Sequence, residues 1–359
     1  MEAISAFPFM LSLSKHGPLP REMMMQSRYR FFLVVSDAAR DVVYREEVSD
    51  FSSCYEDLLF AGVCAGKVVN DGTLPAAAVE PVWRDEKEGK VAGVVMSLPL
   101  LSKHYELTIF ADRVWEALVN RELIKGDGQE EEQKARRFIW RVEAHKREAE
   151  RKGKLRISLS RQPYPLVHCS LSAFGIGSAP REEGPVSLFL SRSLLAELRE
   201  ETVRSLDTER ADILTGHLVQ EAGGQVALVV IGRIPVQTET AASLVHFSFS
   251  PLSFLTAQKE VARRPSGETI VGWHHNHPPP CAGNCLQYLP PCQTSTVFFS
   301  TADRSVHRAS FPAPYMIALV SGKEAGRRAD DPGLQAYGWQ DGVMQQREFF
   351  SFEGGMHGG

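Results

Sequence analysis

The chain has 359 residues, of which 43% are hydrophobic, and its formal net charge at pH 7 is −4. This length is enough for about two domains. The small negative charge gives no general attraction to nucleic acid or to an anionic membrane, and no apolar run reaches the roughly 18 residues that a membrane-spanning helix needs. We therefore expect a cytoplasmic protein whose partners include neither nucleic acid nor a membrane.

The chain begins with an apolar stretch, Ala3–Leu13. Glu2 stands where a secretory signal would carry a basic residue, and no clear small-residue cleavage site follows. Three consecutive methionines, Met23–Met25, precede the first convincing strand. We expect no secretory signal, and we expect residues 1–25 to be disordered or to lie upstream of the true start codon.

An N-terminal α+β domain is expected over residues 26–174, and nothing in its sequence indicates its role. Within it, Gln129–Lys152 repeats apolar residues at i, i+3, i+4 and i+7, which predicts one helix with a single buried stripe. The basic residues of this segment alternate with glutamates, which indicates a solvated face. The other expected elements are the strands Arg30–Val35, Val91–Leu98 and Leu155–Leu159 and the helix Ile109–Leu118.

A polar stretch rich in Gly and Pro, residues 175–185, is the expected linker, and a second domain is expected over 186–355. Two main helices are predicted in this domain. The first begins with a cap at Ser191 or Ser193, and the second has Pro251 in its first turn. Together with these helices, the strands predict a mixed β-sheet of α+β or α/β class. The expected strands are Val186–Leu190, Ile213–Gln220, Gln225–Ile231, Val245–Phe249, Tyr315–Val320, Gln335–Trp339 and Arg347–Phe352.

The clearest chemical pattern lies at the end of a short apolar strand that begins at Thr269. Residues two apart in a strand face the same way, so His275 and His277 point to one side, which provides half of a zinc site. Downstream, Ser300 and Asp303 fit the first turn of a helix, where Asp303 can supply a third ligand. Three protein ligands leave one coordination position of zinc open, which is the catalytic pattern.

These residues resemble the metal-binding motif of the JAMM (MPN-plus) metalloprotease family. The family usually has a shorter spacing between its second histidine and its serine, so residues 278–299 contain an insertion. It also carries an upstream glutamate in the pattern E-x-G-G-(I/V)-L-x-G. Glu209 has this spacing to Gly216, with Ala211 and Asp212 where the family commonly has glycines. The matching motif is Gly272-Trp273-x-His275-x-His277-Pro278 followed by Ser300-x-x-Asp303.

The resemblance implies an MPN-like fold for the second domain and a deubiquitinase-like activity, the hydrolysis of a peptide or isopeptide bond after the C-terminal tail of ubiquitin or a ubiquitin-like protein. It implies that His275, His277 and Asp303 hold Zn²⁺. Glu209 would act as general base and then general acid, and Ser300 would donate a hydrogen bond to the developing oxyanion. The implied partners are a ubiquitin-like protein or its conjugate and the enzymes of ubiquitin-like conjugation.

Three other functions remain open. A processing hydrolase of a sulfur-carrier protein would use the same residues on a different substrate. A non-catalytic MPN scaffold that binds ubiquitin-like partners is compatible with the replaced glycines after Glu209. A metal-dependent nuclease or deaminase is the third, and the chain lacks the complete H-x-E…P-C-x-x-C signature that a deaminase would show, because no two of its cysteines have the C-x-x-C spacing.

The insertion also carries three of the six cysteines, Cys281, Cys285 and Cys292. Without a secretory signal we expect thiols, and clustered thiols favour a metal. These three can supply ligands to a second, structural zinc, and the alternative is unpaired or redox-active thiols. The candidate fourth ligands are His274, His307 and Cys169.

Overall fold

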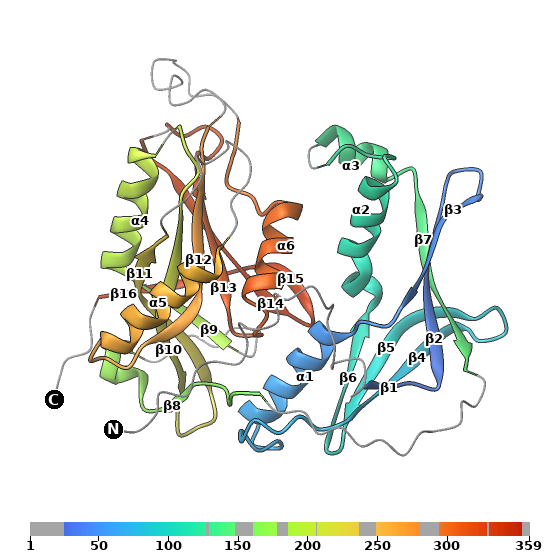
Figure 1. Cartoon of the computed structure of the whole chain (residues 1–359), viewed down its shortest axis with the longest axis horizontal. Coiled ribbons are helices and arrows are strands. Elements are labelled where there is room, and N and C mark those ends of the chain that lie inside the picture. The colour runs from blue at the N-terminus through green and yellow to red at the C-terminus, as the bar shows by residue number, and fades with distance from the viewer. Residues whose placement is uncertain are drawn as a thin grey trace. The chain divides into compact units, whose positions relative to one another are not determined.

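The structure of the protein is a computed structural model (Figure 1), which describes residues 25–126, 129–147, 161–177, 186–205, 207–236, 249–279, 294–328 and 330–353. The contacts divide the chain into two units. The first contains Met1–Tyr164 with Asp341–Val343, and the second contains Pro165–Gln340 with Met344–Gly359. Each unit has its own β-sheet, and the prediction of a mixed α+β fold is confirmed.

The first unit is built on a seven-stranded sheet. Its strands are β1 (Met25–Gln26), β2 (Tyr29–Ser36), β3 (Val42–Val48), β4 (Ala77–Asp85), β5 (Lys90–Leu98), β6 (Leu101–Glu106) and β7 (Ile139–Lys146). Its helices are α1 (Ser52–Cys64), the 3₁₀ helix η3 (Leu107–Phe110), α2 (Ala111–Asn120) and α3 (Gln129–Ala135). The strand order is β1-β4-β5-β7-β2-β3, with β6 beside β5. Helices α1 and α2 contribute Leu58, Leu59 and Leu118 to the core that covers one face of this sheet.

The single helix predicted over Gln129–Lys152 is wrong. Helix α3 ends at Ala135, and the chain then enters β7, which pairs along its whole length with β2. Val142 and Ala144 are buried and alternate with more exposed neighbours, which is the period of a strand. Pairing in the sheet therefore overrides the helical spacing of the apolar residues.

The second unit is built on a nine-stranded sheet. Its strands are β8 (Leu166–His168), β9 (Val186–Ser191), β10 (Ala211–Gln220), β11 (Val226–Pro235), β12 (Thr269–His277), β13 (Ile317–Gly322), β14 (Gly333–Gln340), β15 (Val343–Arg347) and β16 (Phe350–Phe352). Its helices are the 3₁₀ helix η4 (Leu171–Phe174), α4 (Arg192–Arg204), α5 (Pro251–Arg263) and α6 (Thr301–Ser310). The strand order is β15-β14-β13-β12-β10-β11-β9-β16, with β8 beside β10.

Strand β12 lies in the middle of this sheet, antiparallel to β10 and parallel to β13. The backbones of β12 and β13 approach so closely at Gly272 that an added Cβ would lie 2.0 Å from the carbonyl oxygen of Ile317. Glycine is therefore required at this position. The pairing on both sides fixes the register of the strand, and with it the face to which each of its side chains points.

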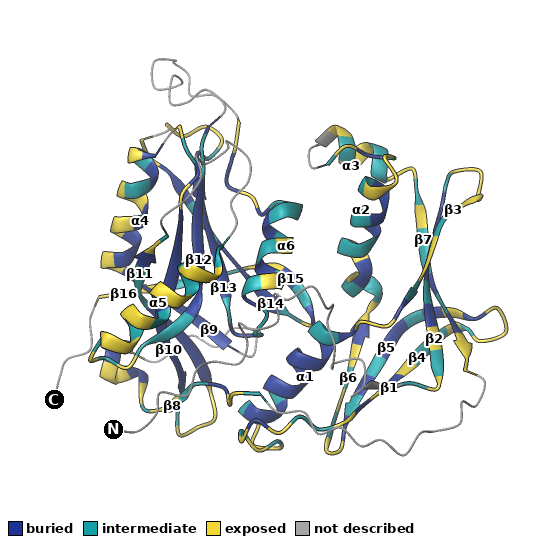
Figure 2. Ribbon diagram, viewed as in Figure 1, coloured by how far each residue is buried: buried dark blue, intermediate teal, exposed yellow. Residues whose placement is uncertain are grey.

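Helices cover both faces of the second sheet. Helix α4 lies on one face, where Thr202 hydrogen-bonds to Ser321 of β13. Helices α5 and α6 lie on the other face, where Ala257 and Phe311 pack with Trp273 of β12. Figure 2 shows that the central strands between the helices are almost entirely buried. None of the helices among the described residues has the length and apolar character that a membrane crossing requires.

Several boundaries differ from those expected from the sequence. Residues 165–174 lie with the second unit, because β8 pairs with β10 and Leu171 and Phe174 join a core with Phe189. The single strand predicted over Arg347–Phe352 is two strands, since β15 and β16 lie at opposite ends of the sheet order. The expected strand Leu155–Leu159, most of Val245–Phe249 and most of the expected linker lie outside the described residues.

Candidate metal centre

Two histidines mark the carboxyl end of β12. His275 is fully buried and stacks on the ring of Trp273, with 4.4 Å between ring centroids. His277 is two residues further on and lies on the same face. The Nε2 atoms of His275 and His277 are 3.0 Å apart. Strand alternation, as expected from the sequence, thus brings the two imidazoles together.

Helix α6 supplies a carboxylate to the same place. Ser300 and Asp303 form a capping box: the Ser300 hydroxyl accepts a hydrogen bond from the Asp303 amide, and the Asp303 carboxylate accepts one from the Ser300 amide at 2.8 Å. The cap turns the carboxylate back over the start of the helix. Its oxygens then lie 3.1 Å from Nε2 of His275 and 3.5 Å from Nε2 of His277.

Glu209 is the fourth member of this cluster and precedes β10. One ligand atom from each of Glu209, His275, His277 and Asp303 lies within 4.8 Å of the other three. The Glu209 side chain is buried, and burial raises its pKa to about 7; His277 lowers this pKa, whereas the charge of Asp303 raises it further. A buried carboxyl with such a pKa can exchange a proton near neutral pH.

The hydrogen bonds of His277 show what the cluster can hold. Its Nδ1 lies 2.9 Å from the carbonyl oxygen of Thr296, a group that only accepts, so Nδ1 carries a proton. In the neutral ring Nε2 is then a bare lone pair, aimed at the carboxylate of Asp303 and at Nε2 of His275. These lone pairs and the carboxylate repel one another unless a proton or a metal cation lies between them.

The spacing of these donor atoms fits zinc. Around tetrahedral zinc, with bonds of roughly 2.0–2.1 Å, neighbouring ligand atoms lie about 3.3 Å apart. Here the two histidine Nε2 atoms are 3.0 Å apart. Oδ1 of Asp303 lies 3.1 Å from Nε2 of His275, and its Oδ2 lies 3.5 Å from Nε2 of His277. Two imidazole nitrogens with carboxylate oxygens are also a donor set that zinc commonly takes.

The pKa shifts agree that the cluster favours one positive charge. Burial raises the pKa of Asp303, but the two histidines outweigh it and hold that pKa well below its usual range. Burial lowers the pKa of His277, but hydrogen bonding to Asp303 outweighs it and raises that pKa overall. Burial lowers the pKa of His275, which favours the neutral ring. A proton or a divalent cation can supply the charge.

His274 belongs to a separate, buried hydrogen-bond network that the amino-acid sequence does not reveal. Its Nδ1 is 2.9 Å from Asp212 and its Nε2 is 2.8 Å from the hydroxyl of Ser321, so both ring nitrogens are engaged. Asp212, at a position where the family commonly has glycine, is also paired with Arg233 at 2.9 Å. His274 is therefore neither a surface residue nor available to the cysteines as a metal ligand.

The remaining expected ligands are placed as follows. Nδ1 of His307 accepts a hydrogen bond from the indole N–H of Trp273 at 3.0 Å, so this nitrogen is engaged in the aromatic core. Cys169 is partly exposed, in the segment between β8 and η4. The three cysteines of the insertion, Cys281, Cys285 and Cys292, lie outside the described residues.

The chain returns from the insertion beside the histidines. Thr296 donates its hydroxyl hydrogen to the carbonyl of His277 at 3.0 Å, and its amide donates to the carbonyl of Lys323 at 2.8 Å. The Lys323 amide in turn donates to the Thr296 hydroxyl. These bonds fix the carbonyl of Thr296 that orients His277.

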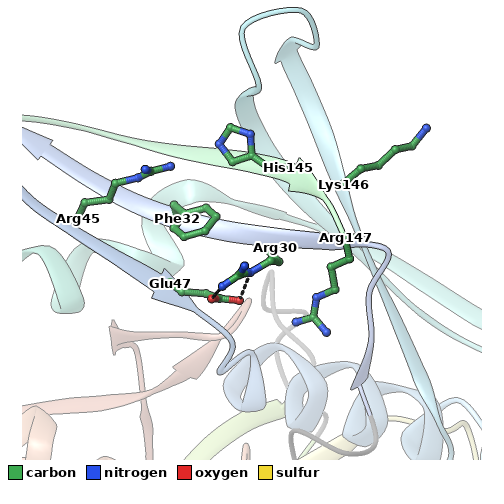
Figure 3. Close-up of a pocket in the computed structure, with 7 residues that line it drawn as sticks. All are labelled: Arg30, Phe32, Arg45, Glu47, His145, Lys146 and Arg147. Carbon is green, nitrogen blue, oxygen red and sulfur yellow. Dashed lines mark hydrogen bonds and ion pairs between the residues drawn. The ribbon is translucent and has the colours of Figure 1, made fainter. Parts of the chain in front are cut away.

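Apart from this cluster, a surface hollow lies in the first unit and has a volume of about 740 Å³. Figure 3 shows Arg30 ion-paired with Glu47 across it. The guanidinium of Arg45 lies over the ring of Phe32, 4.4 Å from its centroid, and also pairs with Glu143. Arg30 and Arg45 are thus each paired with a carboxylate of the same sheet, and the four-residue cluster remains the stronger candidate for chemistry. The residues that line this hollow are Arg30, Phe32, Arg45, Glu47, His145, Lys146 and Arg147.

No model of a known protein family matches the sequence, and a comparison with curated proteins gives no match. Among solved structures, the chain is similar to the solution structure of protein DSY2949 from Desulfitobacterium hafniense, with 19% sequence identity and a TM-score of 0.31. The match covers 46% of this chain and 93% of that chain.

Proposed function

We propose that this chain is a zinc-dependent peptidase or isopeptidase of the JAMM type, with an MPN-like second unit. Its substrate would be the bond that follows the C-terminal tail of ubiquitin or a ubiquitin-like protein. The observation that carries the proposal is the convergence of Glu209, His275, His277 and Asp303, whose ligand atoms all lie within 4.8 Å of one another. These are the residues on which the resemblance to that family rests.

The residues would divide the chemistry as follows. His275, His277 and Asp303 hold zinc, which when bound acts as a Lewis acid and makes water acidic enough to lose a proton near neutral pH. Glu209 accepts that proton and returns it to the leaving amine, a role that suits a buried carboxyl with a pKa of about 7. The oxygen of the Ser300 hydroxyl accepts the capping hydrogen bond of α6. Its hydrogen can still be donated to an oxyanion.

An exposed aromatic side chain at the cluster supports a peptide substrate. Phe298 has 47% of its surface exposed, and its ring centroid lies 5.0 Å from that of His277. The exposed ring would give a substrate chain an apolar surface to pack against beside the cluster. Processing of a sulfur-carrier protein would use the same residues, and only the substrate distinguishes it.

The non-catalytic scaffold is the second candidate, because Asp212 replaces a glycine that is common after the family's glutamate. In this chain the carboxylate of Asp212 is bonded to His274 and Arg233. It therefore points away from the candidate centre and does not compete with Glu209. This observation favours catalysis over the scaffold.

The test is zinc content by elemental analysis, combined with cleavage of fusions to ubiquitin-like proteins. We expect zinc in the wild type, its loss in His275→Ala with His277→Ala, and its retention in Glu209→Gln. Cleavage should fall in Glu209→Gln by about 10²–10⁴-fold, the usual contribution of a general base. Cys281→Ser with Cys285→Ser is the matched control: one zinc fewer with activity retained would indicate a second, structural site.

Two outcomes would decide against the enzyme. A wild type without zinc that cleaves none of the fusions would favour the scaffold. A zinc content that does not fall at all when both histidines are replaced would place the metal elsewhere in the chain.

A further inference from the structure

Asn276 lies between the two histidines of the candidate centre, and its side chain points to the opposite face of β12. It is buried, with 2% of its surface exposed. Its side-chain N–H groups donate to the carbonyl of Ser205 at 2.8 Å and to that of Thr208 at 3.1 Å. Its side-chain oxygen accepts from the amide of Arg210 at 2.7 Å. One carboxamide thus satisfies two carbonyls and one amide of the connection between α4 and β10.

This connection carries Glu209. Its described residues 207–210 are irregular backbone, so no helix of their own fixes the position of the glutamate. The backbone of Asn276 adds a fourth hydrogen bond. Its amide donates to the carbonyl of Arg210 at 3.2 Å, which extends the pairing of β10 with β12 by one residue. The polar backbone groups on either side of Glu209 are therefore bound to the residue that separates the two histidines.

We propose that Asn276 is a positioning residue that holds Glu209 in register with the metal-binding histidines. The catalytic importance of this position of Glu209 rests on the proposed function. The hydrogen bonds from Asn276 to the Glu209 connection do not depend on it. Since His275, Asn276 and His277 are consecutive in one strand, any shift of the strand moves ligands and glutamate together. An amide is required, because only Asn offers two donors and one acceptor at this reach.

Two variants test the role. Asn276→Ala removes all three side-chain hydrogen bonds. Asn276→Asp keeps the size of the side chain and the acceptor for Arg210, but places an oxygen against the carbonyls of Ser205 and Thr208, where two donors are needed. Ser321→Ala is the matched control, because it removes buried polar contacts to Thr202 and His274 on the same face of the sheet and no contact to residues 205–210.

The first measurement is hydrogen–deuterium exchange of the Arg210 amide, with zinc content beside it. In Asn276→Ala we expect that amide to exchange about tenfold faster, the factor that accompanies loss of one hydrogen bond. In Asn276→Asp we expect faster exchange over 207–210. Zinc content should equal that of the wild type in both, because the three ligands lie on β12 and α6. Ser321→Ala should leave exchange of Arg210 at the wild-type rate.

The second measurement is steady-state cleavage, in which kcat should fall while KM stays constant. Unchanged exchange of Arg210 in both Asn276 variants would overturn the inference, and so would loss of zinc with exchange unaltered. If Asn276→Ala does not fold, Asn276→Asp decides: unchanged exchange over 207–210 in that variant would overturn the inference. If the wild type holds no zinc, the proposed function fails, and exchange alone then shows whether Asn276 fixes the Glu209 connection.

Discussion

At the scale of single residues, the centre depends on where each histidine holds its proton. Thr296 commits Nδ1 of His277 to a carbonyl and so leaves Nε2 as the atom that faces Asp303 and His275. Among the described residues, the buried Nδ1 of His275 has no hydrogen-bond partner. Stacking on Trp273 orients that ring instead. The two ligands are therefore held by different means, one by a hydrogen bond and one by packing.

Ser300 has two roles that mutation can separate. Ser300→Ala should lower the free energy of unfolding by about 1 kcal/mol, because the N-cap of α6 is lost, and should reduce kcat by about 10²–10³-fold if the hydroxyl serves the oxyanion. Ser300→Gly should cost only a few tenths of a kcal/mol, because glycine is a tolerable N-cap, yet lose the same activity. Urea unfolding and kinetics of both variants check this. Full activity in Ser300→Gly would remove the oxyanion role.

At the scale of elements, β12 is anchored at its start as well as at its end. Glu268, the residue before the strand, accepts hydrogen bonds from Thr215 of β10 at 2.5 Å, from Ser266 at 2.7 Å and from Arg264 at 2.7 Å. These contacts join the turn after α5 to the neighbouring strand. They fix where β12 begins, and with it which residues reach its far end.

The anchor predicts a pH dependence of stability. Burial raises the pKa of Glu268, but the hydrogen bonds from Thr215, Ser266 and Arg264 outweigh it and lower that pKa below its ordinary value of 4.5. The contribution of the charged group is then complete above the unfolded pKa of about 4.5 and is lost as the pH falls through the folded pKa. Glu268→Gln should be less stable than the wild type at pH 7.

Urea unfolding of metal-free protein between pH 7 and pH 3 checks this. The difference between Glu268→Gln and the wild type should shrink as the pH falls below about 4.5. A difference that stays constant over this range would contradict the assigned shift. Glu260→Gln, on the exposed side of α5, is the matched control and should show no such trend.

The sequence predicts the elements around the centre better than the contacts between them. His275 and His277 follow from strand alternation, and Asp303 from a capping pattern, because both are local rules. Glu209 is identified only through a family pattern, since its partners are distant in the chain. The roles of Asn276 and His274 depend on the register of neighbouring strands, which local patterns do not specify.

The error over Gln129–Lys152 has the same origin. Its apolar residues satisfy a helical spacing, but Val142 and Ala144 also satisfy alternation, and the neighbouring strand β2 decides between them. By contrast, the helix starts at Ser191 and Pro251 are confirmed, because N-cap hydrogen bonds and a first-turn proline act within a few residues.

At the scale of the whole molecule, every residue of the candidate centre lies in the second unit. So do the cores formed around Trp273 and Phe189. A fragment of residues 165–359 should therefore fold and hold as much zinc per chain as the full protein does. Cooperative thermal unfolding and elemental analysis check this. A fragment that is unfolded or holds no zinc would show that the first unit is required for the centre to form.

The bonds of Thr296 have a consequence for how the molecule can vary. They join Thr296 to His277 and to Lys323, and so hold the two ends of the insertion together through residues that the structure describes. Each doubling of the length of a flexible loop costs only about 0.6 kcal/mol in closure entropy. We therefore expect a change in the length of the insertion to cost little free energy as long as Thr296 keeps its bonds to His277 and Lys323.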